Sequence, residues 1–429
     1  MSDDKARLRA FLLLDDIIQN KKYANLTLKN SLEEFDQRDR AFISALVYGT
    51  LDKLITIDYV ISLFAQGKIQ TKIKNILRLG IFQIMFMDKV PDSAAVSTSV
   101  DIAQRIGKGM LKGYINGVLR NISRNKASIQ YPTDKVKYIS VKYSYPEFLV
   151  NELIDEMGLE ECERFCSYSD NRKTCIRVDE NKGNVKEFKA LLDGKDCLYF
   201  ENCFYISGEP KMLENGVCSV QSEASVAVVK ALDLKESDTL LDCCAAPGGK
   251  TVYAATMIKN GKITAFDKHQ HRVELIKHNA ERCGYSHIID AKQADMTEKK
   301  DYGIYDKVLV DALCSGLGVL GQKPEIKNTI TPQGLSEIEQ TQKQILSNAS
   351  KSVKKGGILV YSTCTIRKKE NIDIINNFLK ENNDFALCSL EGLFGEKFEQ
   401  NRELKKGYIQ LYPHIDKIDG FFIARMKRI

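Results

Sequence analysis

Two cysteines follow apolar runs that are typical of buried strands. Cys314 lies in the segment Val-Leu-Val-Asp-Ala-Leu-Cys-Ser-Gly at 308–316, and Cys364 lies in Leu-Val-Tyr-Ser-Thr-Cys-Thr at 359–365. A single cysteine is most often an inert buried side chain. Two thiols at the ends of consecutive strands, which are plausible neighbours in a doubly wound sheet, would face one cleft, and this placement favours nucleophilic chemistry.

One reaction of a pyrimidine ring needs such a thiol. Carbon C5 of the ring is too weakly nucleophilic to accept a methyl group unaided. A thiolate that adds to C6 breaks the conjugation of the ring and makes C5 enamine-like, so that C5 attacks the methyl group of a sulfonium donor. Loss of the C5 proton and of the thiolate then restores the ring. One cysteine suffices for the attack, and a second one can assist release.

A turn of small residues and two acidic residues suggest the methyl donor. Leu-Leu-Asp-Cys-Cys-Ala-Ala-Pro-Gly-Gly-Lys-Thr at 240–251 has the character of a strand, a turn and the start of a helix. It matches neither a Walker A loop nor the GxGxxG fingerprint, so it offers no cradle for a pyrophosphate. Asp267 and Asp295 follow the next two apolar runs, where carboxylates suit ribose hydroxyls and the adenine amine. Nucleoside contacts without phosphate contacts favour S-adenosylmethionine over NAD or ATP.

The elements that position these residues alternate from about residue 217. Apolar runs predict strands at 239–243, 262–266, 288–291, 307–310 and 358–361, with helices expected at 249–259, 270–282 and 333–353. Near-continuous apolar strands separated by helices indicate an α/β fold with a mostly parallel sheet that is covered on both faces. The tail has hairpin character at 408–412 and 420–425, which predicts antiparallel strands at one edge.

The first part of the chain is helical and basic. Apolar residues at three-to-four spacing predict about five helices with short links in residues 1–130, with Gly49 as a weak point between two of them. The net charge of +6 lies entirely in this part. This charge indicates a polyanionic partner such as nucleic acid, although a solvated helical surface would carry it too. The predicted domains are 1–130, a linker and small α+β cap segment at 131–216, and the α/β domain at 217–429.

Composition excludes several classes of protein. Hydrophobic residues make up 43% and charged residues 28%, which argues against disorder. No apolar run approaches the roughly 18 residues that span a bilayer, and the charged start of the chain does not resemble a secretion signal. We therefore expect a cytoplasmic monomer without disulfides or membrane contact. No metal site is expected either, because the cluster Cys162, Cys166 and Cys175 has no histidine near it.

Three segments resemble the signature motifs of the RNA 5-methylcytosine methyltransferases of the Sun family: Cys-Cys-Ala-Ala-Pro-Gly-Gly-Lys-Thr at 243–251, Asp-Ala-Leu-Cys-Ser-Gly at 311–316 and Tyr-Ser-Thr-Cys-Thr at 361–365. Residues 77–96 and 114–120 resemble a NusB-type RNA-binding domain. The resemblance implies a Rossmann-like methyltransferase domain with a mixed, mostly parallel seven-stranded sheet, preceded by an all-α NusB-like domain and a small α+β segment. The implied function is S-adenosylmethionine-dependent formation of 5-methylcytosine in small-subunit (16S) ribosomal RNA through a covalent cysteine–C6 adduct.

The resemblance also implies residue roles. Cys364 would attack C6, and Cys314 would help product release. The S-adenosylmethionine site would be lined by the turn and by three acidic residues: Cys244, Ala245, Ala246, Pro247, Gly248, Gly249, Lys250, Asp267, Asp295 and Asp311. Two assignments stay open, because Asp311 also suits the N3 edge of cytosine and Lys250 also suits the base.

The chain departs from the family pattern in two places. Leu313 replaces the usual proline between alanine and cysteine, which puts the rigidity of the loop that holds Cys314 in question. Residues 321–328 lack the arginine-rich, tryptophan-containing pattern of the family, which would weaken or alter contacts with RNA. Two alternative functions also stay open. One is the same chemistry on transfer RNA or another ribosomal position, and the other is a catalytically spent RNA-binding or ribosome-assembly factor, against which the intact thiol pair argues.

Overall fold

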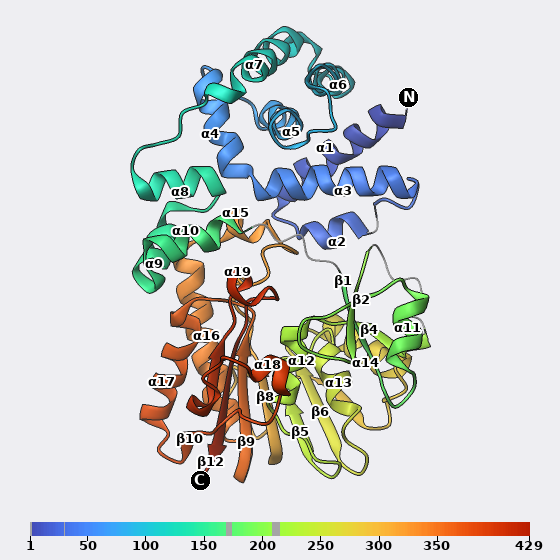
Figure 1. Ribbon diagram of the computed structural model, residues 1–429, viewed down its shortest axis with the longest axis vertical. Coiled ribbons are helices and arrows are strands. Elements are labelled where there is room, and N and C mark those ends of the chain that lie inside the picture. The colour runs from blue at the N-terminus through green and yellow to red at the C-terminus, as the bar shows by residue number, and fades with distance from the viewer. Residues whose placement is uncertain (1, 30, 169–173, 208–214) are drawn as a thin grey trace. The chain divides into compact units, whose positions relative to one another are not determined.

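A computed structural model of the chain describes residues 2–29, 31–168, 174–207 and 215–429 (Figure 1). The chain packs as two compact units. The helical unit comprises Met1–Tyr168 and Leu320–Ile330, and the sheet unit comprises Ser169–Val319 and Thr331–Ile429. None of the described helices combines the length and the apolar character that a membrane crossing requires.

The helical unit is built around one central helix, α5 (Thr71–Phe86). Its side chains from Asn75 to Ile84 are all buried, because apolar residues occur all round this helix and not on one stripe. The helices packed directly against it are α1 (Ser2–Asn20), α3 (Gln37–Asp52), α4 (Leu54–Phe64), α6 (Asp92–Arg105) and α7 (Lys112–Asn125). The unit also contains α2 (Ala24–Lys29), α8 (Lys135–Tyr143), α9 (Glu147–Met157), α10 (Leu159–Ser167), α15 (Ile326–Thr329) and the short 3₁₀ turns η1 (Gly109–Leu111) and η2 (Lys126–Ser128).

The helix break expected at Gly49 is absent. Helix α3 runs through Gly49 to Asp52, and α4 begins two residues later at Leu54. A Cβ atom at Gly49 would lie 2.0 Å from Cζ of Phe82 on α5, so the glycine makes room for an aromatic ring. The sequence pattern cannot distinguish a glycine required for packing from one that ends a helix.

The segment with the altered composition at 321–328 belongs to the helical unit. Lys327 donates a hydrogen bond to the carbonyl of Asp52 (2.9 Å) and forms an ion pair with its carboxylate (2.6 Å). Glu325 accepts a hydrogen bond from the backbone N–H of Ala24 at 3.2 Å. The chain therefore leaves the sheet unit after Val319 and returns to it at Thr331. The two units do not follow the three-part division expected from the sequence.

The sheet unit opens with a small antiparallel sheet of strand order β2-β3-β1-β4. Its elements are β1 (Thr174–Val178), α11 (Val185–Leu191), β2 (Lys195–Asp196), β3 (Cys203–Ile206) and β4 (Cys218–Val220). The core between this sheet and α11 is formed by alternate side chains of the strands, among them Ile176, Val178 and Phe204. This segment is the small α+β part expected from the sequence.

The large sheet has the strand order β10-β12-β9-β8-β5-β6-β7, and β11 pairs with β12 off this path. The pairs among β5, β6, β7, β8 and β9 are parallel, whereas β10, β11 and β12 add antiparallel pairs at one edge. The strands are β5 (Thr239–Asp242), β6 (Lys262–Asp267), β7 (Ile289–Gln293), β8 (Tyr305–Asp311), β9 (Val353–Thr363), β10 (Phe385–Leu387), β11 (Tyr408–Gln410) and β12 (Phe422–Arg428). The expected mixed, mostly parallel sheet is confirmed.

Helices cover both faces of the large sheet (Figure 1). Leu240 and Leu309 face the core that contains α12 (Glu223–Lys230), α13 (Gly249–Ala255) and α14 (Gln270–Arg282). Leu241 and Val308, their neighbours along the strands, face the opposite core with α16 (Pro332–Ser350) and α17 (Ile372–Glu381). Because both faces are buried, each strand needs a continuous apolar run, and this is why the strands could be located from the sequence.

Candidate active site

The turn after β5 lies between the two neighbouring strands. Cys243 N–H donates to Leu309 O of β8 (2.9 Å), and Ala245 N–H donates to Phe266 O of β6 (2.8 Å). The Ala246–Pro247 peptide is cis, and Gly248 has a φ of +101°. A Cβ at Gly248 would lie 3.2 Å from Cα of Ile276 on α14, so glycine is required both for the backbone conformation and for the close approach of that helix.

A carboxylate that sequence reasoning missed lies at the end of β5. Asp242 is buried, and its Oδ2 accepts a hydrogen bond from Thr251 Oγ1 at 2.7 Å. Its Oδ1 is buried without a hydrogen-bond partner among the residues that the structure describes. Burial raises the pKa of Asp242 to about 7. Asp242 could not be singled out from the sequence, because a strand that is not part of a functional site also commonly ends in a single aspartate.

Asp267 and Asp295 lie at the carboxyl ends of β6 and just beyond β7, as expected. Asp267 is buried, accepts a hydrogen bond from the N–H of His269 (3.0 Å) and lies 3.3 Å from Arg272 Nη1. Asp295 pairs with Lys268 at 2.8 Å. Burial raises the pKa of Asp295, but hydrogen bonds from Lys268 and Thr297 outweigh this effect and lower it to about 2. Asp295 is therefore a carboxylate at neutral pH.

Lys250 connects the turn after β5 with the end of β8. Its Nζ lies 2.7 Å from Asp311 Oδ2, and Asp311 Oδ1 accepts a hydrogen bond from Ser362 Oγ at 2.7 Å. Burial lowers the pKa of Lys250, but the Asp311 carboxylate outweighs it and raises this pKa above its usual value, with the Cys364 thiol acting in the same direction. The lysine is therefore charged, and its ion pair with Asp311 holds it at the carboxyl end of β8.

The two thiols meet at the ends of β8 and β9. Cys314 Sγ lies 3.1 Å from Cys364 Sγ and accepts a hydrogen bond from the N–H of Cys364 at 3.2 Å. The loops are tied together by Ser315 Oγ and Thr365 Oγ1, which are 2.7 Å apart. The hydrogen bond with Cys364 and burial both raise the pKa of Cys314 well above its usual range. The juxtaposition expected from the strand ends is therefore present.

Models of two known protein families match the chain. The model of the 16S rRNA methyltransferase RsmB/F family matches residues 229–427, and that of the NusB family matches residues 4–124. The chain is 36% identical to the probable ribosomal RNA small subunit methyltransferase B of Bacillus subtilis, over 96% of each chain. A relative with the same description from Synechocystis is 30% identical over 99% of each chain.

The chain belongs to the 16S rRNA methyltransferase RsmB/F family. As a member of this family it is an S-adenosylmethionine-dependent rRNA cytosine-C5 methyltransferase, and the resemblance of its motifs and of its NusB-type region is confirmed. The crystal structure of PH0851 has a TM-score of 0.83 and 25% identity and covers 99% of this chain and 98% of its own. That of NSun6 from Pyrococcus horikoshii with SFG shares the fold, with a TM-score of 0.59 and 21% identity over 67% of this chain and 99% of its own.

The polar groups of this RsmB/F member fit S-adenosylmethionine. Carboxylates follow three neighbouring strands, at Asp242, Asp267 and Asp295, and the first of them has a buried oxygen without a partner in the described part of the chain. Carboxylates suit ribose hydroxyls, amines and a sulfonium charge, whereas a phosphate would be repelled by them. The donor set therefore matches a cationic nucleoside better than a nucleotide.

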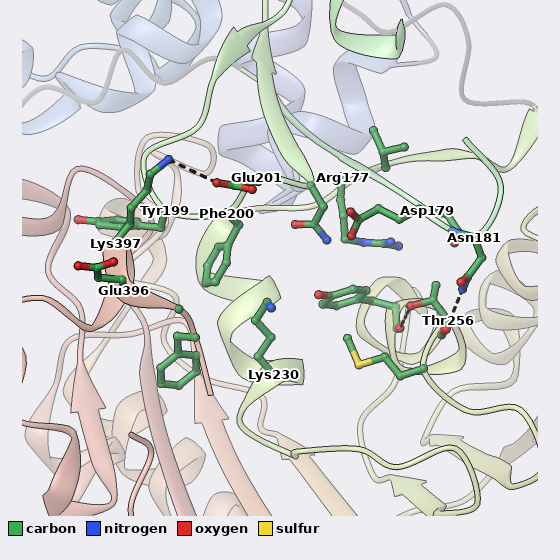
Figure 2. Close-up of a pocket in the computed structure, with 17 residues that line it drawn as sticks. Arg177, Asp179, Asn181, Tyr199, Phe200, Glu201, Lys230, Thr256, Glu396 and Lys397 are labelled. Atoms are coloured by element: carbon green, nitrogen blue, oxygen red, sulfur yellow. Dashed lines mark hydrogen bonds and ion pairs between the residues drawn. The ribbon is translucent and has the colours of Figure 1, made fainter. Parts of the chain in front are cut away.

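A separate cavity of about 590 Å³ lies between the small sheet and the C-terminal parts of α12 and α13 (Figure 2). Arg177 projects into it from β1, beside Tyr253, with 4.4 Å between the guanidinium carbon and the ring centroid. Asn181 donates to the carbonyl of Thr256 at 2.8 Å. None of the site residues expected from the sequence lines this cavity, which lies apart from the thiol pair.

Proposed function

We propose that Cys364 is the nucleophile of this rRNA methyltransferase and that its target is a cytosine of 16S rRNA. The observation that carries the proposal is the 3.1 Å separation of the two thiol sulfurs at the strand ends, with Lys250 paired to Asp311 at the end of the same strand β8. A cation beside a thiol favours the thiolate, which is the nucleophilic form. The target base has to be unpaired or extruded to reach this sulfur.

The reaction divides between the two thiols. Cys364 loses its proton to solvent and adds as a thiolate to C6, which places the electron pair of the C5=C6 bond on C5 and the N3 side of the ring. Carbon C5 then takes up a methyl group. Cys314 loses its own proton to solvent and, as a thiolate, takes the C5 proton. The electron pair of the C5–H bond forms the C5=C6 bond again, and the electron pair of the C6–S bond leaves with Cys364 as a thiolate.

The close contact of the sulfurs explains why the two thiols ionise in turn. Two thiolates 3.1 Å apart would repel each other, so the pair carries at most one negative charge at a time. Once Cys364 is bonded to C6, its charge is gone and the hydrogen bond that raises the pKa of Cys314 is lost. Ionisation of Cys314 is therefore favoured only after the adduct has formed, which is the stage at which the proton has to leave.

S-adenosylmethionine supplies an electrophilic methyl group when it is bound. We assign its binding to the turn after β5 and to the carboxylates at the ends of β5, β6 and β7: Asp242, Cys244, Ala245, Ala246, Pro247, Gly248, Gly249, Asp267 and Asp295. The ion pair of Lys250 with Asp311 favours the alternative in which both residues face the base. Asp311 then accepts or donates a hydrogen bond at the N3 edge of the cytosine.

The helical unit is proposed to hold the RNA through the outer face of α7. Spacings of eight and four residues place three cations along one side of the helix, and we call them the basic stripe of α7: Lys112, Arg120 and Arg124. The opposite face of α7 is buried through Ile115 and Leu119. Contacts of cations with phosphates give affinity without sequence preference and weaken with salt. We further propose that the enzyme works as a monomer in the cytoplasm, where its thiols stay reduced.

Labelled methyl transfer to unmodified 16S rRNA tests the proposal. We expect incorporation with the unaltered enzyme, none with Cys364→Ala, and a covalent RNA–protein adduct that survives denaturing gels with Cys314→Ala. Transfer by Cys364→Ala, or no adduct with Cys314→Ala, would show that the roles of the thiols are wrong. Transfer RNA assayed in parallel distinguishes the open substrate alternative, since faster methylation of it would overturn the 16S assignment.

A further inference from the structure

The loop that carries Cys314 is held by two buried side chains, which we call the clamp. Gln342 of α16 donates from Nε2 to the carbonyl of Leu313 at 2.9 Å. Glu370, in the 3₁₀ turn η4 (Lys368–Glu370), accepts at Oε2 a hydrogen bond from the N–H of Ser315 at 2.8 Å. One backbone group on each side of the thiol is therefore fixed by the clamp.

The clamp residues also hold each other. Gln342 Nε2 donates to Glu370 Oε2 at 3.1 Å, and Arg367 Nη1 pairs with Glu370 Oε1 at 2.9 Å. Gln342 and Glu370 are 0% exposed, and Arg367 is 2% exposed. The Oε1 of Gln342 is buried without a hydrogen-bond partner in the described part of the chain. The hydrogen bonds of the Gln342 side chain are therefore made by its Nε2 group, which donates both to the loop and to the Glu370 carboxylate.

The loop has little rigidity of its own. Leu313 takes the place of a proline, and its side chain is 46% exposed, so it provides neither a fixed φ nor a packing anchor. The loop ends at Gly316, which has a φ of +74°. A buried ion pair contributes little to stability compared with apolar packing of the same volume, so the hydrogen bond that the buried Glu370 accepts from the loop points to a positional role.

We infer that Gln342 and Glu370 are positioning residues that keep the Cys314 thiol beside the C5 proton during product release. The inference rests on the proposed roles of the two thiols. Cys364 directly follows β9, which is paired on both sides by β8 and β12, so its backbone is held by the sheet and depends less on the clamp than that of Cys314 does. Loosening the loop should therefore slow release more than attack, and the covalent adduct should accumulate during turnover.

Gln342→Leu tests this inference in the full-length enzyme with 16S rRNA. The substitution removes both hydrogen bonds and leaves the Arg367–Glu370 ion pair intact. We expect turnover to fall by about 10- to 100-fold, as for a catalytic group displaced by roughly 1 Å, and most of the enzyme to be trapped as adduct on denaturing gels. Adding Leu313→Pro should restore release, because proline restricts the same loop by another means.

Asn348→Leu is the matched control. Asn348 is a buried amide on the same helix, and its Nδ2 donates to the carbonyl of Met296 (2.9 Å), away from the thiols. Whatever this variant does to stability, it should not trap adduct. If Gln342→Leu fails to fold, Gln342→Asn keeps the polarity but withdraws the amide from the loop, and should trap adduct in the same way.

The outcomes separate the inference from the proposed function. If Cys314→Ala traps adduct and the Gln342 variants do not, the clamp has no role in release and the inference is wrong. If Asn348→Leu traps as much adduct as Gln342→Leu, the effect comes from general destabilisation and the inference is again wrong. If Cys314→Ala itself traps none, the assignment of the thiols has failed.

Discussion

Replacing Asp242 by asparagine tests whether the enzyme keeps a buried acid at the end of β5 at a cost in stability. The side chain is 1% exposed, and the hydrogen bond from Thr251 serves only one of its oxygens. Burial raises its pKa from 3.8 to about 7. An acid whose pKa is higher in the folded protein than in the unfolded chain destabilises the fold at every pH at which the unfolded chain has lost the proton.

The size of the effect follows from this pKa. Below about pH 4 the acid is protonated in both states, and its ionisation does not affect stability. Between about pH 4 and pH 7 the destabilisation grows by about 1.4 kcal/mol per pH unit, and above pH 7 it stays near about 4 kcal/mol. Asparagine does not ionise. From pH 5 to pH 8 the unfolding free energy of Asp242→Asn should therefore rise by about 3 kcal/mol relative to the unaltered enzyme.

Urea unfolding at pH 5, 6, 7 and 8, followed by far-UV circular dichroism, measures this difference. Asp306→Asn is the control, because the hydrogen bond from the backbone of Thr239 and the contact with Lys354 lower the pKa of Asp306 to about 2. The ionised Asp306 stabilises the fold at every pH above about 4. The difference in unfolding free energy between Asp306→Asn and the unaltered enzyme should therefore be constant from pH 5 to pH 8. If the unfolding free energies of Asp242→Asn and of the unaltered enzyme change in parallel with pH, the reasoning is refuted.

Three further predictions concern RNA, the thiols and the helical unit. Replacing the three cations of the basic stripe of α7 by glutamines should make RNA binding less sensitive to salt. In filter binding, the plot of the logarithm of the association constant against the logarithm of the salt concentration should become shallower by about 2. Lys250→Met should slow single-turnover methyl transfer on the order of 10²-fold with unchanged RNA affinity, because it removes the charge that pairs with Asp311. Asp52→Asn should destabilise the helical unit by about 2 kcal/mol in urea unfolding: Lys327 is 2% exposed and loses its carboxylate partner while it keeps the carbonyl of residue 52, and Asp52 is 36% exposed, so the pair is partly screened by solvent.

The residues that the sequence placed correctly share one property, which is that the chain around them has a strong local pattern. Cys314 and Cys364 could be brought together because each follows a strand with an apolar run, at 308–310 and 358–361, and such strands end at one edge of a parallel sheet. The same holds for Asp267, which lies where β6 ends. The strand pattern thus determines which side chains meet, even though it says nothing of distances.

The residues that the sequence did not reveal owe their roles to tertiary packing. Gln342 lies among polar residues of a long helix, and Glu370 follows two lysines, so both have the pattern of a solvated surface although they are fully buried. Gly49 has the pattern of a helix break, but it lies under a ring that comes from another helix. Residues 320–330 were expected to stay with the sheet, because nothing local indicates that they pack with the helical unit.

The strand order explains why one lysine can connect the two halves of the site. The chain runs outward from β5 through β6 to β7 and then crosses to β8 and β9 on the other side, so the order reverses between β5 and β8. Ligands bind at such a reversal point. Asp267 and Asp295, which are proposed to hold the nucleoside, lie on one side of it, and the thiols lie on the other. Lys250 is the second residue of α13, which follows β5, and reaches Asp311 at the end of β8, 2.7 Å away. In the proposed mechanism the methyl group passes from one side of this point to the other, and a fixed positive charge there would favour a thiolate on the proposed nucleophile, Cys364.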